Sequence, residues 1–119
     1  VAAFDVLSQL SATDGVGVPE PEWEQAHRRF HAVLGQACGS DWLVHFRTLL
    51  YDQWDRYRRL WFRVRDANST RDIHSEHRQL MEAVVDRDAD AAVFHMQRHI
   101  SASTRVLLQA ENSYFNKEA

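Results

Sequence analysis

With 119 residues, of which 45% are hydrophobic and 11% aromatic, the chain is long enough to bury one core and too short for two domains. Its formal net charge of −3 excludes the overall basic excess of a self-sufficient nucleic-acid binder. Cys38 is the only cysteine, which excludes an intrachain disulfide and favours a reducing, cytoplasmic location; we expect this thiol in the core. No apolar run approaches the ~20 residues that cross a bilayer, so no membrane contact is expected.

The first third of the chain holds all 4 glycines and both prolines, so the remainder lacks breaker residues and favours long helices. Residues 1–10 have apolar side chains at helical spacing before a turn-rich segment, which predicts the end of a helix and a loop. A second helix begins at Pro21, because proline is tolerated in a first turn. Its predicted inner face consists of Trp23, His27, Phe30, His31 and Leu34.

Two further breaks divide the rest of the chain into three more helices. Gly39, Ser40 and Asp41 end the second helix and cap a third, about five turns long. The apolar stripe of the third helix comprises Leu43, Phe46, Leu50, Trp54, Tyr57 and Trp61. The fourth helix begins at about Asp72, and its predicted inner face consists of Ile73, His77, Leu80 and Val84. The fifth helix is capped by Asp88, and its predicted inner face consists of Ala92, Met96, His99, Ser103 and Leu107. No segment alternates with period two, so the expected fold is all-α, an antiparallel helical bundle.

Four of the 7 histidines lie on these inner faces. His27 and His31 are one turn apart on one helix face, close enough to bind the same ion. His77 and His99 flank the turn at 86–88 at similar distances, so in antiparallel helices their heights differ by only ~4–5 Å. Four imidazoles at one level suit zinc first, with nickel, cobalt or iron as alternatives, and suit magnesium or calcium poorly. The alternative for each is a hydrogen-bonded core histidine.

The other three histidines, His45, His74 and His95, fall beside the stripes. We interpret them as surface groups or as residues that support the ligands.

A family pattern joins these features. It has a Phe-His pair, a small-residue break, a long helix, Glu-His opening a penultimate helix, an Asp-rich turn and a final Met-x-x-His. The corresponding stretches are HRRFHAVLGQACGSDWL, LLYDQWDRYRRL, SEHRQLMEAVVDRDADAA and MQRHI. From about Trp23 to Leu108 the chain resembles the FCD ligand-binding domain of the FadR branch of GntR-superfamily transcriptional regulators.

The resemblance implies a bundle of up to six or seven helices that dimerises and binds a small organic acid at or beside a divalent metal. His31, His77 and His99 match the family's three metal-binding histidines. His27 stands where many members have Asp, and is either a fourth ligand or a hydrogen-bond partner of the effector.

The effector also needs a group to hold its far end. Arg58 is the candidate clamp for the acid, beside Trp54 and Tyr57, and the alternative is that it is an exposed arginine. Trp54 and Trp61 are interpreted as core residues or as walls of an effector cavity.

The whole chain, residues 1–119, is expected to form one effector- and metal-binding helical domain. It opens at Val1 without an initiator methionine, which suggests a fragment. The family's winged-helix DNA-binding domain of roughly 70 residues and the usual first helix of the sensing domain are absent from it. DNA binding is therefore implied only for a parent protein.

Two alternatives to sensing stay open from the sequence. One is a stand-alone metalloenzyme acting on a small carboxylate-like substrate, with Glu24, Glu76 or a spare histidine as general acid or base. Glu76 directly precedes His77 and so points about 100° away from it on a helix, which weakens that role. The other is a purely structural metal with four protein ligands and no open position.

Overall fold

The computed structural model describes residues 1–13, 18–65 and 70–115, with side chains described as far as residue 111. The helices are α1 (Ala2–Ser8), α2 (Pro21–Gln36), α3 (Asp41–Val64), α4 (Ile73–Val85) and α5 (Ala89–Phe115). Within these ranges there is no strand, and Thr13 and Pro19 form an isolated bridge. The prediction of an all-α fold is confirmed. None of the described helices is long and apolar enough to cross a membrane.

Local sequence signals set the helix boundaries. Pro21 occupies the first turn of α2. Ser40, Asp72 and Asp88 each accept a hydrogen bond from the backbone N–H three residues later, at 3.4, 3.0 and 2.9 Å, and so satisfy a free donor at the start of α3, α4 and α5. Gly39 has a φ of 71°, a left-handed conformation that favours glycine, and it turns the chain from α2 into α3.

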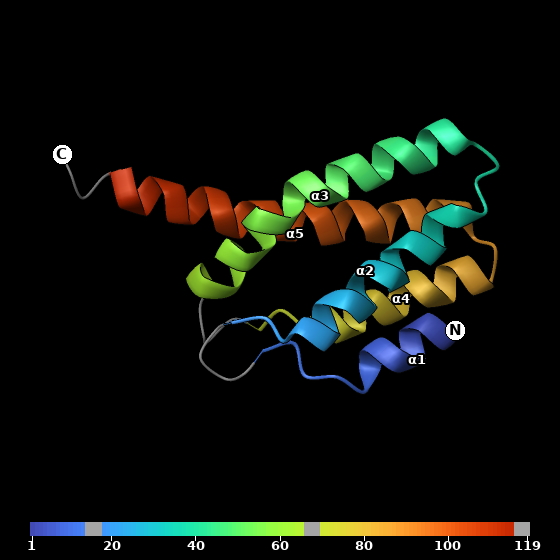
Figure 1. Cartoon of the computed structure of the whole chain (residues 1–119), viewed down its shortest axis with the longest axis horizontal. Coiled ribbons are helices and arrows are strands. Elements are labelled where there is room, and N and C mark those ends of the chain that lie inside the picture. Colours follow the sequence, from blue (N-terminus) through green and yellow to red (C-terminus); the bar gives the residue numbers. More distant parts are fainter. Residues whose placement is uncertain (14–17, 66–69, 116–119) are drawn as a thin grey trace.

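Consecutive long helices run antiparallel, and α5 runs along most of the molecule (Figure 1). α4 and α5 form a hairpin, α1 packs against α2 and α4, and α3 packs against α5 and α2. α3 and α5 run in one direction, and α2 and α4 run in the opposite direction (Figure 1). This arrangement brings one face each of α2, α4 and α5 together.

The hydrophobic core lies between α1, α2, α4 and the end of α3. Its buried members are Phe4, Leu7, Trp23, Ala26, Phe30, Trp61, Phe62 and Leu80. The rings of Trp23 and Phe62 meet edge to face, with centroids 5.4 Å apart, and this contact joins α2 to α3. These apolar residues therefore cover one side of the helix faces that carry the histidines.

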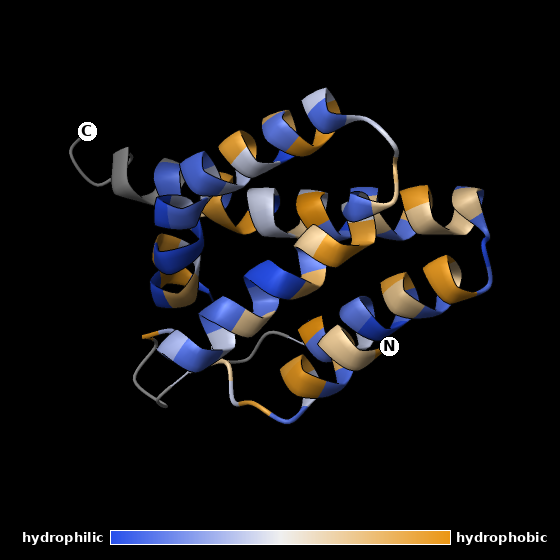
Figure 2. Ribbon diagram, turned by 45° about the vertical axis from the view of Figure 1, so that its right-hand side comes forward, coloured by the Kyte–Doolittle hydropathy of each residue, from blue (hydrophilic) through white to orange (hydrophobic). Residues whose placement is uncertain are grey.

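The first half of α3 departs from the prediction. Leu43 and Leu50 were expected on an inner face, but their side chains are 61% and 67% exposed. Only the last turns of α3 are buried, at Arg58, Trp61 and Phe62. Hydrophobic positions therefore lie along the outer end of α3 (Figure 2).

Two smaller predictions of burial are also wrong. Cys38 is exposed, because it follows the end of α2 in the connection to α3, where its Sγ lies 3.6 Å from the carbonyl oxygen of Ser40. Val84 is exposed near the end of α4, beyond the helices that form the core.

Candidate metal and effector site

Four histidines from three helices converge at the centre of the bundle. His27 and His31 come from α2, His77 from α4 and His99 from α5, and one ligand nitrogen of each lies within 4.8 Å of the others. Nε2 of His31 is 3.1 Å from Nε2 of His27 and 3.3 Å from Nε2 of His77. The rings of His77 and His99 are tilted by 57° relative to each other, with centroids 4.8 Å apart. The helices therefore bring all four predicted residues to one point.

Burial keeps three of these imidazoles neutral, those of His27, His31 and His77. His77 is only 2% exposed, and loss of water together with the neighbouring histidines lowers its pKa from 6.5 to about 2. Burial likewise lowers the pKa of His31 to about 3 and that of His27 well below 6.5. A neutral imidazole keeps a lone pair on one nitrogen, which is the form that binds a metal.

Supporting residues determine which nitrogen of His99 faces the cluster. Its Nδ1 donates to Oε2 of Glu76 at 2.7 Å, which leaves Nε2 for the cluster. Arg71 binds the same carboxylate with two hydrogen bonds of 2.7 Å and also donates to the His99 carbonyl oxygen at 3.1 Å. Burial alone raises the pKa of Glu76, but the hydrogen bonds from Arg71 and His99 outweigh it and hold the pKa at about 2. Glu76 is therefore an ionised carboxylate that orients His99.

Tyr51 on α3 has the same role toward His27. Its hydroxyl lies 2.8 Å from Nδ1 of His27, so Nε2 of that ring faces the cluster. Burial raises the pKa of Tyr51 to about 12, and the hydroxyl stays protonated. His27 and His99 are thus each held by a partner on Nδ1.

The spacing of the nitrogens fits a transition metal. Zinc–nitrogen bonds of about 2.0–2.1 Å place two ligands of a tetrahedral site about 3.3–3.4 Å apart. The separations of 3.1 and 3.3 Å between His31 and its two neighbours are close to that value, and all four ligand nitrogens lie within 4.8 Å of one another. An all-nitrogen set suits zinc, nickel, cobalt or iron and does not suit magnesium or calcium. The residues present therefore fit the metal that the sequence predicts.

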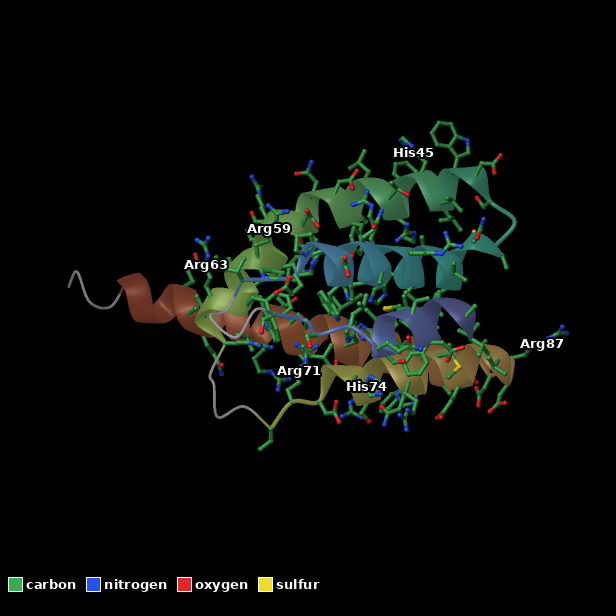
Figure 3. The ribbon with its side chains drawn as sticks, turned by 60° about the horizontal axis from the view of Figure 1, so that its bottom comes forward. His45, Arg59, Arg63, Arg71, His74 and Arg87 are labelled. Carbon is green, nitrogen blue, oxygen red and sulfur yellow. The ribbon has the colours of Figure 1, made fainter. Side chains whose placement is uncertain are left out.

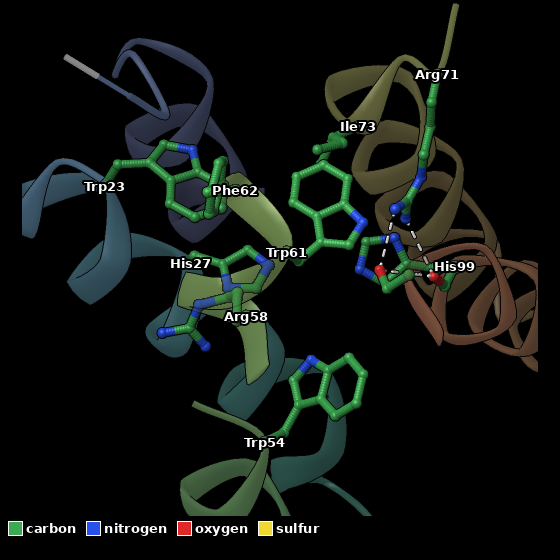
Figure 4. Close-up of a pocket in the computed structure, with 10 residues that line it drawn as sticks. Trp23, His27, Trp54, Arg58, Trp61, Phe62, Arg71, Ile73 and His99 are labelled. Carbon is green, nitrogen blue, oxygen red and sulfur yellow. Dashed lines mark hydrogen bonds between the residues drawn. The ribbon is translucent and has the colours of Figure 1, made fainter. Parts of the chain in front are cut away.

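A small cavity of about 50 Å³ adjoins His27 and His99 (Figure 4). Aromatic rings and two arginines line it, from Trp23, Trp54, Arg58, Trp61, Phe62 and Arg71. This volume holds a few water molecules or a carboxylate-sized group. Two of the three predicted effector residues, Trp54 and Arg58, are part of the wall. The third, Tyr57, is not: its side chain is 41% exposed and packs on Trp54.

Arg58 is buried at 7% exposure, so the alternative of an exposed arginine is wrong. It pairs with Asp55 and, at 3.5 Å, with Glu24. Within the described part of the chain, Nε and Nη1 of Arg58 and Nε1 of Trp61 are buried donors without a hydrogen-bond partner. Unsatisfied buried donors are costly, and at a cavity wall either a water molecule or a bound ligand can supply the acceptor.

Comparison with known proteins identifies the family of the chain. The FCD domain family model matches residues 4–102, most of the chain. The chain belongs to the FCD domain family. This confirms the resemblance to GntR-type regulators.

Two relatives of this FCD domain are HTH-type transcriptional regulators. It is 39% identical over 88 residues to the uncharacterized HTH-type transcriptional regulator BphR of Paraburkholderia xenovorans strain LB400, covering 74% of this chain and 35% of the relative. It is 33% identical over 112 residues to the HTH-type transcriptional repressor GlaR of Escherichia coli K12, covering 92% and 51%. The chain thus spans about half or less of the length of these relatives. No solved structure matches it.

These findings favour a regulator domain over a stand-alone metalloenzyme. The carboxylates that an enzyme needs as acid or base are already engaged: Glu76 with Arg71 and His99, and Glu24 with Arg58 and Arg59.

The sequence did not predict the supporting roles of three residues of the FCD domain. The sequence predicted that Glu76 points away from His77. It did not reveal that this direction leads to His99 on the antiparallel α5. Arg71 lies before α4 and has no periodic signal, and Tyr51 lies beside a stripe that was interpreted as apolar. His45 and His74 are exposed (Figure 3), and the ring of His74 lies 5.4 Å from that of Phe4 on α1. Together with His95, they lie outside the cluster.

Proposed function

We propose that this FCD domain is the sensing part of a GntR-type transcriptional regulator. In this proposal, residues 1–119 bind a small organic acid at or beside a divalent transition metal, and binding controls how a parent protein contacts DNA. One observation carries the proposal: four histidine nitrogens converge beside a cavity whose wall contains buried donors without a partner among the described residues.

In this proposal the histidines have distinct roles. His31, His77 and His99 would hold the metal, with zinc the first choice and nickel, cobalt or iron as alternatives. His27 is the fourth nitrogen, either as a ligand or as a partner of the effector. When bound, the metal supplies a Lewis-acidic centre for a carboxylate. The cavity beside His27 and His99 favours an open coordination position over a closed structural site.

The parent protein follows from the relatives and from the exposed surface. A helix-turn-helix domain outside this chain would contact DNA, as the names of the relatives suggest, and we place the parent protein in the cytoplasm. The exposed apolar residues on the first half of α3, Trp42, Leu43, Phe46 and Leu50, support a homodimer. An effector shifts such a protein only if it binds one arrangement more tightly than the other.

Metal content and melting temperature test the sensing role together. The chain is stripped with a chelator, reloaded with zinc, and titrated with short organic acids while the melting temperature is recorded. We expect zinc to bind at one equivalent and acids to raise the melting temperature only of the zinc-loaded form. His99→Ala should abolish both effects, whereas His95→Ala, one turn earlier on α5, should retain them. Absence of bound metal, or acids without effect on the loaded protein, would contradict the proposal.

A further inference from the structure

A second cavity, of about 310 Å³, is lined by residues of α1, α2 and α4, where α1 packs against the other two helices (Figure 1). It is larger than the cavity beside His27 and His99, and its lining is different. Among the described residues that line it there is no Asp, Glu, Lys or Arg. Its apolar walls come from the three helices and from the connection after α1, and consist of Phe4, Leu7, Leu10, Ala12, Trp23 and Ile73.

This larger cavity has an exposed polar mouth and a buried floor. Ser8 at the end of α1 and His74 in the first turn of α4 are exposed (Figure 3). Leu7, Trp23 and His77, which also line it, are only 4%, 5% and 2% exposed. A volume near 300 Å³ with mainly apolar and aromatic walls and a few polar groups is typical of a small-molecule site.

We propose that the larger cavity binds a small uncharged molecule that has an apolar body and one neutral polar group. A single aromatic ring with a short alkyl chain and a hydroxyl group is an example of this class. The apolar body gains free energy because its surface and that of the walls leave water. A charged ligand loses its hydration there without an ion-pair partner among the described wall residues.

The polar group of such a ligand has a partner at the mouth. The Ser8 hydroxyl donates to the carbonyl oxygen of Asp5 at 2.9 Å, and its oxygen can still accept a hydrogen bond from the ligand. The ligand class thus differs from the organic acid of the proposed function, and its binding requires no metal.

The two cavities share part of their walls. Trp23 and Ile73 line both of them. The indole of Trp23 also stacks on the ring of His27, with centroids 4.6 Å apart and an angle of 18° between the planes. An occupant of the larger cavity therefore contacts a side chain that packs directly on the histidine cluster.

Three probes of similar size and different charge test the class of ligand. The zinc-free chain is titrated by calorimetry with phenylpropanol, phenylpropanoate and phenylpropylamine, each with its polar group at the end of the alkyl chain. We expect the alcohol to bind at one site, at least about tenfold more tightly than either charged probe, and with a negative heat-capacity change. In the zinc-loaded chain the alcohol is compared with the amine alone, because the proposed acid site would also take the carboxylate.

Two substitutions test the location. Ala12→Phe puts a ring into the cavity and Ser8→Phe adds one at its mouth, and each should weaken binding of phenylpropanol at least about tenfold, because the ring takes the space of the ligand. Ser11→Phe, at the exposed position beside Ala12 and not part of the described wall, is the matched control and should change binding less than about twofold. Since Ser8 is exposed, Ser8→Phe serves as the test if Ala12→Phe does not fold.

The contrary outcomes are distinct from failure of acid sensing. Absence of phenylpropanol binding, or equal binding of phenylpropanol and phenylpropylamine, would overturn the site for an uncharged ligand. Binding that survives both Ala12→Phe and Ser8→Phe would overturn its location. Affinity for phenylpropanol that falls as the protein concentration rises would show that a second copy of the chain fills the cavity instead. None of these results changes the response of the zinc-loaded chain to organic acids, which tests the proposed function separately.

Discussion

Helical periodicity in the sequence predicted that both the histidine cluster and the first half of α3 are buried. The structure places them in opposite environments. His77 is polar and 2% exposed, whereas Leu50 is apolar and 67% exposed. Helical periodicity correctly grouped the residues of each face. It did not determine which face is covered, because burial depends on the neighbouring helix and not on the helix itself.

Each unusual environment needs a partner. The buried histidines are satisfied by one another and by Tyr51 and Glu76, and a metal would complete them. The exposed leucines of α3 have no such cover within the described chain, where the buried residues of α3 lie in its last turns. The comparison thus predicts that the first region responds to a metal and the second to a second copy of the chain.

Metal removal should have the largest effect on the first region. Zinc at a thousandfold excess over its dissociation constant stabilises the folded chain by about 4 kcal/mol. For a domain of this size we expect the melting temperature to fall by roughly 10–25 °C on chelation. His77→Ala should lose this zinc-dependent shift, and His74→Ala, an exposed histidine on the same helix, should keep it. A full zinc shift in His77→Ala would show that the cluster is not the metal site.

Truncation of one leucine in each region compares them directly. Leu80 is 1% exposed in the core, and Leu80→Ala should lower the free energy of unfolding by about 2–5 kcal/mol. Leu50→Ala should change it by less than about 0.5 kcal/mol in the monomer. Urea unfolding at several protein concentrations measures both. A loss above about 1 kcal/mol in Leu50→Ala that grows with protein concentration would show that a second copy covers α3.

Much of this fold could be predicted because its boundaries are local. Pro21, Ser40, Asp72 and Asp88 act on their own helices, and the structure places the helix starts there. The approach of His77 to His99 was also predictable, since it required only the register of α4 and α5 across one short turn at 86–88.

The supporting groups of the site were not predictable in the same way. Glu76 meets His99 because of the rotation of α4 against α5, and Arg71 reaches both from outside any helix. Contacts of this kind depend on the packing of side chains from different elements, and a single sequence carries no periodic signal for them.

Glu76→Gln should have the next largest effect. Gln retains the shape of Glu76 but removes the charge that orients His99 and pairs with Arg71. Loss of a carboxylate behind a histidine ligand weakens metal binding about 10–100-fold. Competition with a chelating dye measures the zinc affinity. Glu82→Gln, exposed on the same helix, is the control. An unchanged zinc affinity in Glu76→Gln would show that the contact serves folding alone.

Tyr51→Phe should have the smallest effect on zinc affinity. It is nevertheless the most specific test of whether His27 is a metal ligand. The change removes only the hydroxyl that lies 2.8 Å from Nδ1 of His27. If His27 binds the metal, its ring loses an orienting partner and zinc affinity falls by about tenfold or less. Tyr57→Phe, an exposed tyrosine on the same helix, should leave the affinity unchanged.

The effector separates the two roles of His27. With His27 as a fourth ligand, Tyr51→Phe weakens zinc binding, and acid binding to the fully loaded chain stays the same. With His27 as a partner of the effector, zinc affinity is unchanged and acid affinity falls instead. The second result would reduce the metal site to His31, His77 and His99 and leave a coordination position open beside the cavity, which is what an acid-sensing site requires.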